Sequence, residues 1–143
     1  MIGWSRGGMI TYLALKKPNK IKAAVIGNGT SDLFLAVKKK PNLKQNPLSE
    51  CIANYWGNRE AELTKRSAIY WADSLIKESS LLLICGTLDK RVYYHQSVIM
   101  GDKLPSINYD YPFKSFETGH SFRGKKKELN QAIITRFQKH LKE

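Results

Sequence analysis

Three side chains that together support acyl-transfer chemistry occur along the chain in the order Ser5, Asp89, His120. A serine hydroxyl attacks a carbonyl carbon when a neighbouring histidine removes its proton, and a carboxylate orients that histidine and stabilises its charged form. A serine, acid, histidine order is typical of enzymes whose serine projects from a sharp turn between a strand and a helix. We therefore expect these residues to form a catalytic triad.

The serine lies in a G-x-S-x-G motif with one further glycine behind it, in residues 3–8, G-W-S-R-G-G. A nucleophilic serine at such a turn adopts a backbone conformation that crowds its neighbours. Gly3 and Gly7, two residues before and after the serine, relieve that crowding and let helix and strand approach closely. Gly8 is a further glycine directly behind the motif. The motif precedes an amphipathic segment, which is the context that supports a nucleophile elbow.

The residues next to Ser5 have predicted roles as well. The backbone N–H of Arg6, at the start of a helix, would face the negative oxygen that develops during acyl transfer. Trp4 would line a substrate pocket or pack beneath the turn. The competing interpretation is a glycine-rich turn in which Ser5 only caps the helix.

The aspartate and the histidine each follow a predicted strand. Asp89 comes after the apolar run 81–85, and His120 comes after residues 113–116. Loops at the carboxyl ends of parallel strands meet at one edge of a sheet, so all three candidates should lie there. Taken singly, Asp89 is equally well interpreted as an ordinary turn residue, and His120 as a residue at the start of a helix. The weaker competitors lack this strand context: His95, His140, Asp32, Asp73, Asp102 and Asp110.

Strands and helices alternate along the chain, which indicates a parallel sheet covered by helices. We expect one α/β domain over residues 1–143, because there is no internal repeat and no low-complexity linker. The predicted strands are residues 23–26, 81–85 and 113–116. The predicted helices are residues 6–17, 93–104 and 125–142, with a polar-rich helical excursion over about 31–72.

Apolar spacing predicts which helix faces are buried, and proline predicts an edge. Pro112 cannot donate to a sheet ladder, so the last strand should lie at an edge or be restricted to residues 113–116. In the first helix the expected apolar stripe is Met9, Ile10, Leu13 and Ala14. In the last helix the core-facing residues would be Leu129, Ile133, Phe137 and Leu141.

The chain is strongly basic, with 24 Lys and Arg against 12 Asp and Glu and a net charge of +12. Nucleic-acid binding is one interpretation, but the charges are scattered and no DNA-binding motif accompanies them. We favour a solvated Lys-rich surface, with no nucleic-acid partner. No apolar run reaches the roughly 18 residues that a membrane span requires, so no membrane partner is expected.

The two cysteines, Cys51 and Cys85, cannot form a disulfide framework and have no zinc-ligand spacing, so we expect neither metal nor cofactor. Cys85 lies in an apolar run and should be buried. This cysteine usage favours a reducing compartment such as the cytoplasm. A targeting signal in an N-terminal region outside the sequence would override that expectation.

Four segments resemble the prolyl oligopeptidase family of serine peptidases. They are residues 3–8, residues 66–73 (R-S-A-I-Y-W-A-D), residues 86–92 (G-T-L-D-K-R-V) and Gly119-His120. The resemblance implies the C-terminal half of an α/β-hydrolase fold, a mostly parallel sheet with flanking helices, acting on a peptide or small acyl substrate. The chain departs from the family at Thr118, where family members carry a loop richer in Gly and Asp, and at Ala68, where proline is common.

In the family, strands before the elbow supply half of the sheet and the second oxyanion donor, and many members carry a β-propeller. This sequence begins just before Ser5, so we expect a truncated domain whose exposed sheet edge favours self-association. Three alternatives stay open at this point: an inactive fragment or remnant, an esterase, and a basic nucleic-acid-binding module.

Overall fold

The computed structural model describes residues 1–16, 20–39, 59–109 and 111–141. Its four strands form one parallel sheet in the order β1-β2-β3-β4. Their bounds are β1 Ile2–Trp4, β2 Ala23–Gly27, β3 Ser80–Gly86 and β4 Phe113–Phe116. The α-helices of the described residues are α1 Arg6–Leu15, α2 Leu33–Lys39, α4 Arg59–Arg66, α5 His95–Ser106 and α6 Lys126–His140. The predicted α/β class and parallel sheet are confirmed.

The two central strands are buried along their whole length. Every residue of β2 and β3 is buried, as expected for strands covered on both faces. The run 81–85 predicted this, and Cys85 is fully buried within it. β4 lies at the edge of the sheet, and Pro112, just before it, takes part in the ladder only as a hydrogen-bond acceptor. Its carbonyl accepts the N–H of Leu83 at 3.0 Å. The predicted edge strand at residues 113–116 is therefore confirmed.

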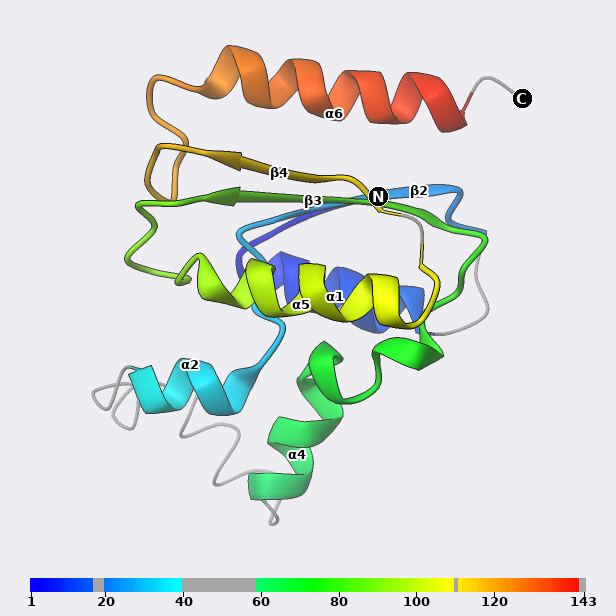
Figure 1. Cartoon of the computed structure of the whole chain (residues 1–143), viewed down its shortest axis with the longest axis vertical. Coiled ribbons are helices and arrows are strands. Elements are labelled where there is room, and N and C mark those ends of the chain that lie inside the picture. Colours follow the sequence, from blue (N-terminus) through cyan, green and yellow to red (C-terminus); the bar gives the residue numbers. More distant parts are fainter. Residues whose placement is uncertain (17–19, 40–58, 110, 142–143) are drawn as a thin grey trace.

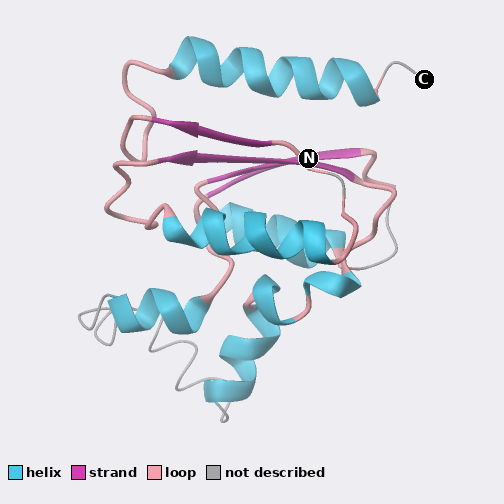
Figure 2. Ribbon diagram, viewed as in Figure 1, coloured by secondary structure: helices cyan, strands magenta, loops and turns pink. Residues whose placement is uncertain are grey.

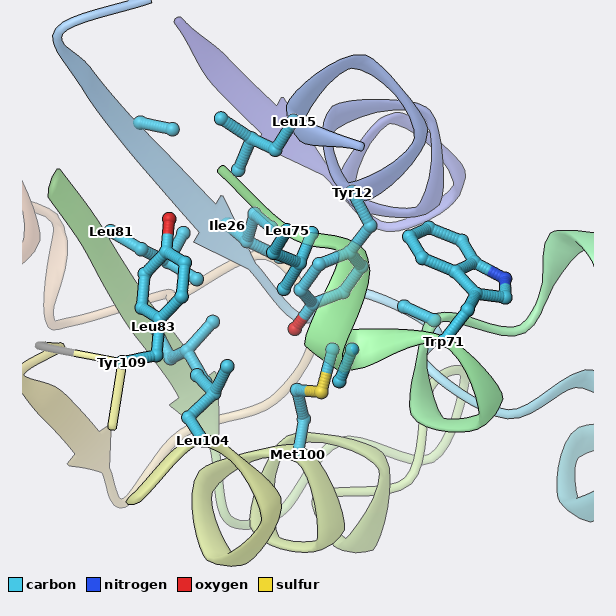
Figure 3. Close-up of a cluster of buried hydrophobic side chains, with 13 residues drawn as sticks. Tyr12, Leu15, Ile26, Trp71, Leu75, Leu81, Leu83, Met100, Leu104 and Tyr109 are labelled. Carbon is cyan, nitrogen blue, oxygen red and sulfur yellow. The ribbon is translucent and has the colours of Figure 1, made fainter. Parts of the chain in front are cut away.

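Helices cover both faces of the sheet, as Figures 1 and 2 show. The helices α1 and α5 lie on one face, and α2 and α4 lie beyond them. On this face the core joins Tyr12 of α1, Leu83 of β3 and Met100 of α5, with Trp71 closing one side (Figure 3). This layer positions the loops at the carboxyl ends of the strands.

The opposite face is covered by α6 (Figure 1). Leu129, Ile133 and Phe137 pack against a second core cluster that includes Phe122, as their spacing of four predicted. The prediction for Leu141 is wrong, because that side chain is 54% exposed. The helix ends at His140, so Leu141 no longer follows the helical face.

The buried face of α1 differs from the predicted stripe. Met9 is buried, but Ile10 is 52% exposed, and Gly8, Thr11 and Tyr12 are buried instead. Thr11 lies on the buried face without an apolar side chain because its hydroxyl donates to the carbonyl of Gly7 at 3.0 Å. The buried side of the helix thus combines the large Met9, Tyr12 and Leu15 with the small or polar Gly8 and Thr11, and a pattern of apolar residues does not reveal the last two.

The described parts of the segment 31–72 are helical. Besides α2 and α4 it contains a 3₁₀ turn at Ala68–Tyr70, and a second such turn lies at Ala72–Ser74. Of the aromatic residues in this region, Trp71 is buried and Tyr70 is exposed. None of the helices in the described part of the chain is both long and apolar enough to cross a membrane.

Candidate active site

The serine occupies a strained turn between β1 and α1. Ser5 has φ 55° and ψ −119°, a combination that costs a non-glycine residue about 1–3 kcal/mol and that clusters at functional sites. Its N–H donates to the carbonyl of Gly27 at 2.9 Å, so the ladder between β1 and β2 holds the turn in place. Among the described residues the Ser5 side chain makes no capping hydrogen bond to α1. The geometry therefore does not support the interpretation of Ser5 as a helix cap.

The three glycines of the motif differ in what surrounds them. A Cβ placed on Gly3 would lie 2.1 Å from Oγ1 of Thr11 and 2.3 Å from the carbonyl oxygen of Gly7. A Cβ on Gly8 would lie 2.6 Å from Cα of Gly29, where α1 crosses the end of β2. At Gly7 no atom of the described residues lies within 4 Å of such a Cβ. Close packing thus explains Gly3 and Gly8, whereas Gly7 faces open space in this part of the protein.

Arg6 is the first residue of α1. The first N–H groups of a helix have no acceptor within the helix, and the helix dipole makes this end attractive to negative charge. The backbone N–H of Arg6 therefore suits the oxyanion contact predicted for it, and that role stays a prediction.

The aspartate is buried and uses both carboxylate oxygens. Oδ1 of Asp89 accepts the backbone N–H groups of Arg91 at 2.7 Å and Val92 at 3.0 Å, which holds the carboxylate in one orientation. Oδ2 lies 2.7 Å from Nδ1 of His120. An ionised carboxylate only accepts, so Nδ1 carries the proton and Nε2 of the neutral ring is left as a proton acceptor. This is the tautomer that a general base for a serine hydroxyl requires.

Backbone contacts hold the aspartate loop against the histidine loop. The N–H of Thr87 donates to the carbonyl of Phe116 at 2.9 Å, and the N–H of Leu88 donates to the carbonyl of Thr118 at 3.1 Å. A Cβ on Gly86 would lie 2.5 Å from the Thr118 carbonyl oxygen. Glycine at the end of β3 therefore permits the close approach that brings Asp89 to His120.

The elbow also contacts the histidine loop, through the residue before the serine. Nε1 of Trp4 donates to the carbonyl oxygen of His120 at 3.3 Å. The indole packs edge-on against Phe122, with ring centroids 4.9 Å apart, and covers Gly27, where a Cβ would lie 1.9 Å from the ring. These contacts hold the indole beneath the histidine loop, and a part for Trp4 in a substrate pocket stays a prediction.

The competing acids and histidines have other surroundings. Oδ1 of Asp32 accepts the N–H of Leu35 at 3.1 Å, at the start of α2. His95 is exposed at the start of α5 and lines, with Asp89 and Tyr94, a cavity of about 180 Å³. His140 lies in the last turn of α6. Asp110 falls outside the described residues.

Two buried amides near the site were not singled out from the sequence. Gln96 connects α5 to the start of the 31–72 segment: its Oε1 accepts the N–H groups of Ser31 at 2.9 Å and Asp32 at 2.8 Å. Asn28 donates from Nδ2 to the carbonyl of His120 at 3.1 Å. The signal for Asn28 is its position between two glycines at the carboxyl end of a strand, a pattern that by itself indicates only a turn.

Several solved structures that resemble this chain are peptidases by name. A puromycin-hydrolyzing peptidase of Mycobacterium tuberculosis matches 99% of this chain with a TM-score of 0.84 and 25% identity. An acylaminoacyl peptidase of Pyrococcus horikoshii matches 99% with a TM-score of 0.81 and 23% identity, and a putative dipeptidyl aminopeptidase IV of Bacteroides ovatus matches 97% with a TM-score of 0.71 and 18% identity. The last two show the fold alone. The chain spans 22%, 24% and 19% of the length of these three proteins.

Comparison with curated protein sequences found no match. The sequence model of the prolyl oligopeptidase family, in contrast, matches residues 1–143. This match covers the elbow, the aspartate loop and the histidine loop together. The chain therefore belongs to the prolyl oligopeptidase family.

Proposed function

We propose that this chain carries the nucleophile, base and acid of a serine hydrolase of the peptidase type. The reaction is acyl transfer through a covalent acyl-enzyme, and the substrate is a peptide or a small acyl compound. The observation that carries the proposal is the 2.7 Å contact between Asp89 and His120, in a loop that Trp4, the residue before the strained Ser5, also contacts.

In the first half of the reaction, Oγ of Ser5 attacks the substrate carbonyl carbon while Nε2 of His120 takes the hydroxyl proton. Asp89 holds the ring in place and stabilises the imidazolium that forms. The N–H of Arg6 donates to the oxyanion of the tetrahedral intermediate. When the intermediate collapses, the bond to the leaving group breaks, and His120 gives its proton to the departing amine or alcohol.

In the second half, water replaces the leaving group. Nε2 of His120 takes a proton from that water, the water oxygen attacks the acyl carbon, and a second tetrahedral intermediate forms. Its collapse returns the proton to Oγ of Ser5 and releases the carboxylic acid. Loss of one oxyanion donor costs roughly 10²–10³ in rate in comparable enzymes, which is the size of the contribution proposed for the Arg6 N–H.

The family and the neighbouring structures support a peptidase-type substrate. Since the matched structures are named for puromycin hydrolysis and for acylaminoacyl peptides, the first substrates to compare are an aminoacyl amide, an N-acylaminoacyl amide and a simple activated ester. Preference for either amide favours a peptidase, whereas turnover of the ester alone favours the esterase alternative.

The test is hydrolysis of these three substrates by the full-length protein that contains the sequence, with Ser5→Ala as the decisive variant. We expect Ser5→Ala to remove turnover. Ser106→Ala is the matched control, because Ser106 is an exposed serine and the last residue of α5. Turnover that persists in Ser5→Ala contradicts the proposal, and a folded but inactive wild type favours the inactive-remnant alternative.

A further inference from the structure

Asn28 follows β2 directly, and its side chain bonds both to the histidine loop and to the end of β3, where the aspartate loop begins. Its side chain is 1% exposed, and its backbone has φ 45°. Asparagine tolerates this left-handed conformation better than most residues do, because its short polar side chain bonds locally. The preceding residue, Gly27, accepts the N–H of Ser5 at 2.9 Å, so Asn28 lies one residue from the partner of the nucleophile.

Both ends of the Asn28 amide are used. Oδ1 accepts the N–H of Gly86 at 2.8 Å, and Nδ2 donates to the carbonyl of His120 at 3.1 Å. A backbone N–H only donates and a carbonyl only accepts, so these two partners determine which way the amide points. The backbone N–H of Asn28 also donates to the carbonyl of Ile84 at 2.8 Å, which attaches the residue to β3.

These contacts close a ring around the acid and the base. From His120 the ring passes through the amide of Asn28 to the N–H of Gly86. The carbonyl of Gly86 accepts the N–H of Asp89 at 3.2 Å, and Oδ2 of Asp89 returns to Nδ1 of His120 at 2.7 Å. The links between residues in this ring are hydrogen bonds, and Asn28 supplies the only side-chain amide in it.

We propose that Asn28 is a positioning residue for the proposed hydrolase: by bridging Gly86 and the carbonyl of His120, it holds the imidazole in line with Asp89 and close to Ser5. This inference rests on the proposed function. Asparagine meets three requirements at once, namely a left-handed backbone, an acceptor and a donor. Aspartate keeps the first two, and glycine keeps only the first.

The test compares Asn28→Gly and Asn28→Asp with wild type in two measurements. The first is the far-downfield proton resonance of the His120 Nδ1–H, which reports the contact with Asp89 whether or not the protein hydrolyses anything. The second is kcat and KM for an activated ester, measured well below the unfolding temperature and normalised to folded protein. Asn108→Gly is the matched control, because Asn108 also has a positive φ, of 54°, but is exposed in the turn after α5.

We expect Asn28→Gly to broaden or remove the resonance and to lower kcat by roughly 10- to 100-fold, with KM within about twofold of wild type, because small displacements of a base cost this much. Asn28→Asp retains the acceptor for the N–H of Gly86, so we expect this variant to fold even if Asn28→Gly does not. It should show the same loss of the resonance and the same decrease in kcat. Asn108→Gly should change neither measurement.

An intact resonance together with unchanged kcat in both Asn28 variants overturns the inference, as does a loss of activity that only follows the loss of folded protein. If hydrolysis by the wild type does not depend on Ser5, the proposed function fails, and the resonance alone then decides the role of Asn28.

Discussion

The indole N–H of Trp4 donates a hydrogen bond to the backbone carbonyl of His120, a residue 116 positions later in the chain. Trp4 precedes the candidate nucleophile, and His120 is the candidate base, so this bond connects the two loops on which acyl transfer would depend. The carbonyl accepts a second bond from Asn28. The histidine is thus held through its backbone by two side chains and through its ring by a third, Asp89.

Replacing Trp4 with phenylalanine removes the indole donor and keeps most of the aromatic packing. We expect Trp4→Phe to lower the free energy of unfolding by about 1 kcal/mol and to slow turnover several-fold, because the histidine loop loses one of its two donors. Trp71→Phe is the matched control: Nε1 of Trp71 donates to the carbonyl of Lys65 at 3.1 Å, away from the histidine loop. Urea denaturation and ester hydrolysis measure both effects. Equal effects of the two variants on turnover would contradict this account.

Glycines 3 and 7 should respond differently to alanine. Gly3→Ala forces a methyl group against Thr11 and the Gly7 carbonyl, so we expect a loss of about 1–3 kcal/mol of unfolding free energy or failure to fold. Gly7→Ala meets no atom of the described residues within 4 Å and should be tolerated or slightly stabilising, since alanine is the better helix former. Thermal unfolding of the two variants checks this. A Gly7→Ala variant that is as unstable as Gly3→Ala contradicts it.

Removing the charge of Asp89 tests how far the reaction depends on orienting the imidazole. Asp89→Asn keeps an oxygen for the N–H groups of Arg91 and Val92 but presents an amide to Nδ1 of His120. By analogy with other triads, we expect kcat to fall by about 10⁴-fold with little change in stability. Asp102→Asn, at an exposed position of α5, is the control for the substitution itself. A fall of less than tenfold in Asp89→Asn would mean that the contact with Asp89 does not orient the base.

Alkaline pH should destabilise the fold through a buried thiol. Burial raises the pKa of Cys85 from 9.0 to about 11, so between these values the unfolded chain loses a proton that the folded chain keeps. The contribution of the buried thiol to the free energy of unfolding is therefore fully present below about pH 9 and is lost as the pH rises through about 11. We expect the urea midpoint to fall over this window and to fall less steeply in Cys85→Ala. Cys51→Ala is the comparison variant, and an unchanged slope in Cys85→Ala contradicts the assignment.

The architecture was predictable because its signals are local. The apolar run 81–85 predicted β3, and Pro112 predicted an edge strand at residues 113–116. The motif around Ser5 and the strand-then-loop context of Asp89 and His120 predicted one sheet edge, and the structure brings the last two into contact.

Other features depend on partners that are distant in the sequence. Apolar spacing predicts that Ile10 is buried, but α1 instead buries Gly8 and Thr11, whose small and polar side chains carry no apolar signal. The role inferred for Asn28 depends on Gly86 and His120, which lie 58 and 92 residues away. No local pattern distinguishes such an asparagine from an ordinary turn residue.

The most direct measurement of the central claim is the site at which a fluorophosphonate probe attaches to the full-length protein that contains this sequence. Mass spectrometry of the digested protein should find the adduct on the Oγ of Ser5, and His120→Ala should reduce its formation to background. An adduct on a different residue, or equal labelling of the wild type and His120→Ala, would show that Ser5 is not a nucleophile activated by this histidine.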